Sequence, residues 1–150
     1  MPISTLSLVL DASTAVAESL RRRGMALFQN ERLELAITEE AWSETRHELG
    51  KRIAIVSGRF GFSADEQAAL LASTTFTLSA CLYVVPKEAY DPFREAALGR
   101  IPQDPDDWSS VALALALGVG IWTEDRDFFG SGLATWRTPV LRHVLETEAV

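Results

Sequence analysis

The sequence predicts an α/β protein built as a three-layer α/β/α sandwich, with a mainly parallel sheet between two layers of helices. Short apolar segments typical of buried strands alternate along the chain with longer segments of helical periodicity, and this alternation favours a sheet covered on both faces. Two of the apolar segments, Leu6–Leu10 and 119–122, run directly into polar and acidic residues. Because side chains at the carboxyl ends of parallel strands converge on one crevice, these segments also predict where a site would lie.

The first half of the chain shows two strands, each followed by a helix. Leu6–Leu10 is expected to form a buried strand, and a helix is expected over about 14–23. Leu33–Thr38 predicts a second strand. A long helix should begin after Thr38, a good N-cap followed by two glutamates, and should end at the glycines within 58–61.

The second half continues the alternation. The expected helices cover 65–72, 87–100 and 104–117, and the expected strands cover 76–85 and 121–123. Residues 140–145 should form a last short strand or helix. No internal repeat, linker or low-complexity stretch divides the sequence, so a single domain is expected over residues 1–150.

Charge and composition narrow the class of protein. A net charge of −7 argues against a broad electrostatic grip on nucleic acid, although basic residues at 21–23 and 46–59 could concentrate positive charge locally. Solvated helix surfaces are the simpler explanation for each of them. No apolar run is long enough to span a membrane, and the N-terminus does not resemble a secretory signal. The single cysteine, Cys81, suits a reducing compartment, so a cytoplasmic location is expected.

Asp11 is the most informative residue, because it stands directly after a largely apolar strand, where an unpartnered charge is costly. A purely structural role as helix N-cap is the alternative. Ser13 or Thr14 could supply that cap instead, which favours a functional role for Asp11.

The acidic segment 104–107 has two competing explanations. Asp104 as N-cap, with Pro105 after it and two acids in the first turn, makes a good helix start. That explanation needs only some of the three acids. Asp107 stands at the mouth of the most apolar helix in the chain and is the stronger candidate for a functional role.

Asp125 and Asp127 follow the last predicted strand at alternate positions, and function is favoured for Asp125 more than for Asp127. Glu44 is ambiguous. A helical wheel places it almost opposite the apolar stripe of its helix, so the residues alone do not distinguish it from the neighbouring glutamates.

Carboxylates gathered at one sheet edge repel one another and lose hydration, and a bound cation makes such a site tolerable. Zinc is not expected, because His47, His143 and Cys81 lack zinc-ligand spacing. A phosphatase with Asp11 as nucleophile stays open, although Ser13 occupies the position where such enzymes often carry a second aspartate. A non-catalytic partner-binding module also stays open; its interface would involve tryptophans at positions 42, 108, 122 and 136.

Taken together, these motifs resemble the PIN-domain nucleases, especially the short bacterial toxins of the VapC type. The resemblance lies in four segments: the strand ending in Asp11, the helix start at 38–49 with Glu44, the helix beginning at Asp107, and the closing motif 123–128 with Thr123 and Asp125. They occur in the family's order over nearly the whole chain. Residues 60–90 match no motif of the family.

The resemblance implies a Rossmann-like sandwich that cuts RNA with Mg²⁺ or Mn²⁺. The metal-binding and catalytic residues would be Asp11, Glu44, Asp107 and Asp125. Residues bordering the metal site and supporting its ligands would be Ser13, Thr123, Asp127 and Asp104. Family members commonly form homodimers, and the toxins are held inactive by a small antitoxin protein.

Overall fold

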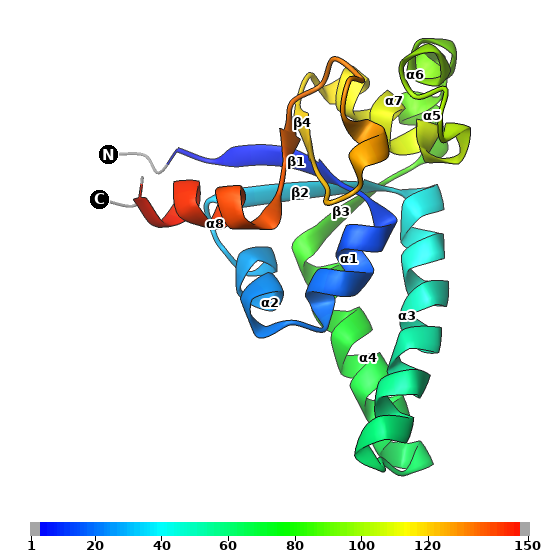
Figure 1. Ribbon diagram of the computed structural model, residues 1–150, viewed down its shortest axis with the longest axis vertical. Helices are drawn as coiled ribbons and strands as arrows, with labels where there is room; N and C mark the ends of the chain where they lie inside the picture. The colour runs from blue at the N-terminus through cyan, green and yellow to red at the C-terminus, as the bar shows by residue number, and fades with distance from the viewer. Residues whose placement is uncertain (1–3, 148–150) are drawn as a thin grey trace.

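The computed structural model describes residues 4–147 and contains a five-stranded parallel sheet. Its strands are β1 (Leu6–Leu10), β2 (Leu33–Thr38), β3 (Leu82–Val85), β4 (Gly120–Trp122) and β5 (Thr135–Trp136). They lie in the order β3-β2-β1-β4-β5, and every neighbouring pair is parallel. Helices cover both faces, so the expected three-layer α/β/α architecture is confirmed (Figure 1).

One face of the sheet is covered by helices from both ends of the chain. These helices are α1 (Ala12–Ser19), α2 (Arg22–Phe28), α3 (Glu39–Phe60), α4 (Ala64–Cys81) and α8 (Thr138–Thr147). Leu8 and Leu10 of β1 point into this layer and share a core with Trp122 of β4. The other face is covered by α5 (Lys87–Tyr90), α6 (Arg94–Arg100) and α7 (Trp108–Leu117).

The central strand β1 contributes to both cores. Val9 packs into the α7 layer, whereas its neighbours Leu8 and Leu10 pack into the opposite one. All three are at most 2% exposed. A strand buried on both faces reads as a continuous apolar run, which explains why the sequence predicted β1 with the bounds observed.

The strand order creates a crevice between the carboxyl ends of β1 and β4. The chain leaves β1 through α1 and α2 to β2 on one side, and it returns from β3 through α5, α6 and α7 to β4 on the other. Leu10 pairs with Trp122 across the two strands, so Asp11 and Thr123 follow at adjacent positions. In open α/β sheets, such a reversal of strand order is where ligands bind.

Helices α3 and α4 form a hairpin that projects away from the sheet (Figure 1). Thr38 is the N-cap of α3, as predicted, since its hydroxyl accepts a 2.9 Å bond from the Ala41 N–H. Gly61 ends α3 in the left-handed conformation at φ 68°, and Ser63 then starts α4 with a capping box closed by Glu66.

Several predicted boundaries were wrong. The single helix expected at 14–23 is two helices, α1 and α2, interrupted at Leu20 and Arg21. The strand expected over 76–85 is confined to β3, because α4 continues helically to Cys81. The helix expected at 87–100 is divided by a short 3₁₀ turn, η1 (Asp91–Phe93), which contains a proline.

The end of the chain also differs from expectation. Residues 140–145 belong to a helix, α8, and the edge strand β5 before it was not predicted. β5 has only two residues, too few for an alternating pattern to be detected in the sequence. Across residues 4–147, no helix combines the length and apolarity that a membrane crossing requires.

Candidate metal centre

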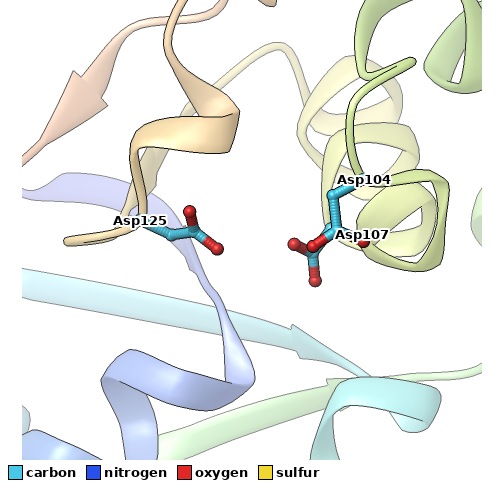
Figure 2. Close-up of side chains that lie close together, drawn as sticks. All are labelled: Asp104, Asp107 and Asp125. Atoms are coloured by element: carbon cyan, nitrogen blue, oxygen red, sulfur yellow. The ribbon is translucent and has the colours of Figure 1, made fainter.

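Three aspartates from separate segments gather beside the β1–β4 crevice. Asp104 and Asp107 lie before α7, and Asp125 lies after β4. One carboxylate oxygen of each lies within 4.8 Å of the other two. Figure 2 shows the side chains of Asp104 and Asp107 directed toward Asp125 from the opposite side of the site. Among residues 4–147 this is the one group of three or more acidic, histidine or cysteine side chains that close together.

Helix capping does not account for Asp104 and Asp107. Asp104 precedes the 3₁₀ turn η2 (Pro105–Asp107) and Asp107 precedes α7, yet neither side chain caps the helix that follows it. The cap is made by the backbone instead, as the Asp107 N–H donates to the Asp104 carbonyl at 3.2 Å. Both carboxylates are therefore left to face Asp125, which favours the functional explanation of this segment over the structural one.

Asp125 is held in place by its own loop. Its carboxylate accepts a 2.9 Å bond from the Asp127 N–H at the start of η3 (Arg126–Phe128). Its own N–H donates to the Thr123 hydroxyl oxygen, also at 2.9 Å. The loop after β4 thus fixes both ends of this residue.

Asp11 combines a structural and an electrostatic role. It is the N-cap of α1, accepting a 2.7 Å bond from the Thr14 N–H, and Ser13 donates to the same oxygen at 3.3 Å. The other oxygen accepts a short hydrogen bond from the Thr123 hydroxyl. Asp11 stands outside the three-carboxylate group, but it is only 3% exposed. Its charge raises the pKa of Asp107, and the charge of Asp125 raises the pKa of Asp11.

The electrostatics of the site disfavour several ionised carboxylates at once. Lost hydration raises the pKa of Asp107 to about 8, with further contributions from a hydrogen bond and the charge of Asp104, then from Asp11 and Asp125. Burial likewise raises the pKa of Asp11, against the opposing effect of its hydrogen bonds with Thr123 and Thr14. A divalent cation would relieve this repulsion, because it favours the charged form of each ligand.

Glu44 lies on the side of α3 that faces this site. Lost hydration raises its pKa, followed by the charges of Glu48, Asp11 and Asp104. The buried stripe of α3 runs through Ala41, Thr45, Leu49, Ile53 and Ser57, and it includes Leu49 and Ile53 of the predicted stripe. Glu44 is exposed and lies nearly opposite the centre of this stripe, as the helical wheel predicted. It lines a cavity of about 230 Å³ together with Ser13 of α1.

The neighbouring glutamates are distinguished from Glu44 by their ion pairs. Glu40 lies 4.0 Å from Lys87, and Glu48 lies 3.3 Å from Lys51. Glu44 has no such partner within residues 4–147. An unpaired carboxylate beside the aspartates remains available to a cation.

Three further residues lie around the site. Asp127 is half-buried, and lost hydration together with the charges of Asp125 and Asp104 raises its pKa. The hydroxyls of Thr38 and Ser109 lie 2.9 Å apart and join the start of α3 to the first turn of α7. Sequence reasoning missed this link, although a serine pair inside an otherwise apolar helix was a detectable signal.

The chemistry of the donors fits a hard cation. Carboxylate and hydroxyl oxygens suit Mg²⁺ or Mn²⁺, whereas zinc sites use histidine and cysteine, which are absent from the group of three. Two of the four tryptophans that could have marked an interface are structural: Trp122 is fully buried and Trp108 is 8% exposed.

A family model described as PIN domain matches residues 9–146 of this chain. The match begins within β1 and extends into α8, so it includes every element that contributes to the crevice. No curated protein matches the chain.

Proposed function

The chain belongs to the PIN-domain family, whose activity is that of a nuclease, and we propose that it is a metal-dependent endoribonuclease that hydrolyses RNA phosphodiester bonds. The observation that carries this proposal is the convergence of Asp104, Asp107 and Asp125 at the end of the crevice, with Asp11 linked to them through Thr123. These acids come from separate segments of the chain, so helix capping within one segment does not explain why they lie together.

In this proposal, Mg²⁺ or Mn²⁺ is held by Asp11, Glu44, Asp107 and Asp125. Burial and mutual repulsion of the carboxylates support the assignment, and so does the absence of a capping role for Asp107. The side chains of Asp104 and Asp107 are close enough to hydrogen bond when one of the two carboxyl groups is protonated. Asp104 therefore adds negative charge next to the proposed ligand Asp107. When bound, the ion would lower the pKa of a coordinated water and offset negative charge on the scissile phosphate.

The remaining residues orient these ligands. Thr123 donates to Asp11 and accepts from the Asp125 backbone, so its hydroxyl fixes the spacing of two ligands from different strands. The Asp127 N–H holds the Asp125 carboxylate. Ser13 lies beside Asp11 on an exposed helix turn, where its hydroxyl can contact a substrate phosphate.

We further propose that the protein is the cytoplasmic toxin of a toxin–antitoxin pair and forms a homodimer. The resemblance of its four acidic motifs to the VapC-type toxins supports this assignment. Exposed aromatic residues on the projecting α3–α4 hairpin support a protein contact there: Phe60 is 72% exposed and Phe76 is 75% exposed. Aromatic residues are enriched at protein–protein interfaces.

RNA cleavage with and without divalent metal tests the enzymatic proposal. Wild-type protein should cut a mixed-sequence RNA in Mn²⁺ and stop in EDTA, and Asp107→Asn should abolish cleavage while keeping the fold. Asp106→Asn is the matched control, because Asp106 is an exposed neighbour outside the three-carboxylate group. Undiminished cleavage by Asp107→Asn, or equal losses in both variants, would reject the assignment.

The toxin proposal has its own readout. Expression of the wild-type protein should arrest bacterial growth, and the Asp107→Asn variant should not. Light scattering tests the homodimer, which the substitution Phe76→Ser should weaken if the hairpin carries the contact.

A further inference from the structure

Three cavities surround the exposed face of α1 and lead away from the carboxylates. The first, of about 310 Å³, contains Asp125 and reaches Arg21. The second, of about 230 Å³, contains Glu44 and reaches Arg52. The third, of about 410 Å³, lies farther along the helices and contains both of these arginines.

Shared lining residues show that these three cavities adjoin one another, and together they are called the depression here. Ser13 lines the first and second cavities, Arg52 the second and third, and Ala17 and Arg21 the first and third. Ser13 also donates to Asp11. The depression therefore begins at the candidate metal centre, and most of its lining residues belong to α1 and α3. These two helices lie side by side (Figure 1).

The charge of this depression reverses along its length. Its near end is acidic, with Glu44 and Glu48 one helical turn apart on α3. Its far end holds Arg21, Arg52 and Arg59 and contains no acidic side chain. The fifteen residues from Glu44 to Arg59 correspond to about 22 Å of helix. Three cations are thus concentrated on a chain whose net charge is −7.

The arginines at the far end are available to an external anion. Arg52 and Arg59 are exposed and form no ion pair within residues 4–147. Arg21 reaches Glu18 at 3.1 Å, yet its side chain remains 53% exposed. Glu48 lines the second cavity together with Arg52 and is 3.3 Å from Lys51. The floor between the arginines is apolar, with Ala17, Leu20 and Val56 lining it.

We propose that this depression is the binding track for the single-stranded RNA that flanks the scissile phosphate, with Arg21, Arg52 and Arg59 contacting backbone phosphates several nucleotides from the metal. This inference rests on the proposed ribonuclease function. A positively charged groove with an apolar floor is the usual surface for a single strand, because cations follow the phosphates and apolar atoms contact the bases. Arginine also pairs with phosphate through two parallel hydrogen bonds.

Cleavage of long and short substrates tests the track. Arg52→Ala/Arg59→Ala should lower kcat/KM on a 12-nucleotide RNA by ~10-fold or more, since each lost phosphate contact weakens binding severalfold. The single variant Arg59→Ala should cleave a dinucleotide at the wild-type kcat/KM, because Arg59 lines only the third cavity, which contains none of the carboxylates. Arg23→Ala/Arg142→Ala is the control: it removes the same charge from residues that line none of these three cavities.

Binding measured without cleavage separates this inference from the function on which it rests. Binding of a labelled 12-nucleotide RNA is measured by fluorescence anisotropy in an Asp107→Asn background at several salt concentrations. The slope of log K against log salt concentration should decrease in magnitude by about 0.7 for each arginine removed. An equal loss on long and short RNA, or an equal loss in the control, would overturn the track even if the protein is a ribonuclease.

The binding arm also decides between RNA and an acidic polypeptide as the occupant. If polyglutamate binding depends on Arg52 and Arg59 while RNA binding does not, the track is wrong and the groove recognises protein. If the wild-type protein cleaves no RNA, the proposed function fails, and the binding measurement still tests the groove independently.

Discussion

The hydroxyl of Thr123 donates to Asp11 and accepts the Asp125 N–H, so one side chain connects the ends of β1 and β4. Thr123 and Asp11 are 0% and 3% exposed, and water cannot easily replace this bond. A buried carboxylate that loses its donor is left with an uncompensated charge. The Thr123–Asp11 contact therefore contributes both to the stability of the fold and to the geometry of the candidate metal centre.

Thr123→Val should weaken both properties, because valine keeps the shape of threonine and removes its hydroxyl. The free energy of unfolding should fall by about 1–3 kcal/mol, as expected for a buried polar group left without a partner. RNA cleavage should fall by roughly 10- to 100-fold, the usual effect of losing a residue that orients a metal ligand. Chemical denaturation and cleavage rates measure the two effects. Thr123→Ser keeps the hydroxyl and should restore most of both.

Metal-free protein should become less stable as the pH rises from 5 to 8. The pKa of Asp107 is raised from its ordinary value of 3.8 to about 8 in the folded protein. In that pH window the folded state holds a proton that the unfolded state has released, so stability falls as the pH increases. Melting temperatures in EDTA should therefore be lower at pH 8 than at pH 5.

The same experiment has a matched pair of variants. Asp107→Asn should flatten the pH dependence, whereas Asp106→Asn should leave it close to wild type because Asp106 is exposed and outside the group. Added Mn²⁺ should stabilise the wild-type protein more at pH 8 than at pH 5, because protons compete with the metal for the same oxygens. A melting temperature that rises with pH in EDTA, in wild type and Asp107→Asn alike, would contradict the electrostatic account.

Gly24→Ala should disrupt the packing of the first turn of α2 against the end of α1. A Cβ atom at this position would lie 2.1 Å from the Glu18 carbonyl oxygen and 2.6 Å from the Glu18 Cβ atom. The backbone would have to shift, at a cost of about 1–3 kcal/mol. Gly50→Ala is the control in α3, where an added Cβ meets nothing within 4 Å. That substitution should stabilise the protein by ~0.5–1 kcal/mol. Thermal denaturation measures the stability of both variants. If both substitutions lower the melting temperature, or both raise it, the packing argument is wrong.

Ser63→Ala should separate stability from activity. Ser63 closes the capping box of α4, with its hydroxyl accepting the Glu66 N–H at 3.1 Å and its own N–H donating to the Glu66 carboxylate at 3.0 Å. Loss of the cap should lower the free energy of unfolding by about 1 kcal/mol. Because this turn lies at the far end of the projecting hairpin, the cleavage rate at 25 °C should not change. A large loss of activity would show that the hairpin contributes directly to the site.

The central strands could be predicted from the sequence, because their environment leaves a simple pattern. Leu6–Leu10 and Leu33–Thr38 are apolar segments ended by polar residues, and their observed bounds agree with prediction. By contrast, Thr74, Thr75 and Phe76 favour strands by propensity but belong to α4. Contacts with α3 and a strong N-cap outweigh that preference. Within the helix, the Thr77 hydroxyl donates a hydrogen bond to the Ser73 carbonyl oxygen.

The candidate site was partly predictable for a similar reason. Asp11 and Asp125 follow adjacent parallel strands, so topology alone brings them to one crevice. Asp104 was predicted only to support the ligands, with helix capping as the alternative, and the three-dimensional arrangement shows its side chain directed toward Asp125. Periodicity placed Glu44 correctly on the exposed side of α3. It could not show that Glu44 lines a cavity together with Ser13 of α1, because that contact depends on how the two helices pack.

Calorimetric titration with Mn²⁺ tests the central claim most directly, because that claim is that distant carboxylates hold a divalent ion together. Wild-type protein should bind Mn²⁺ saturably, Asp106→Asn should bind it with similar affinity, and Asp107→Asn/Asp125→Asn should show no saturable binding. Absence of binding by the folded wild-type protein, or wild-type affinity in the double variant, would contradict the account.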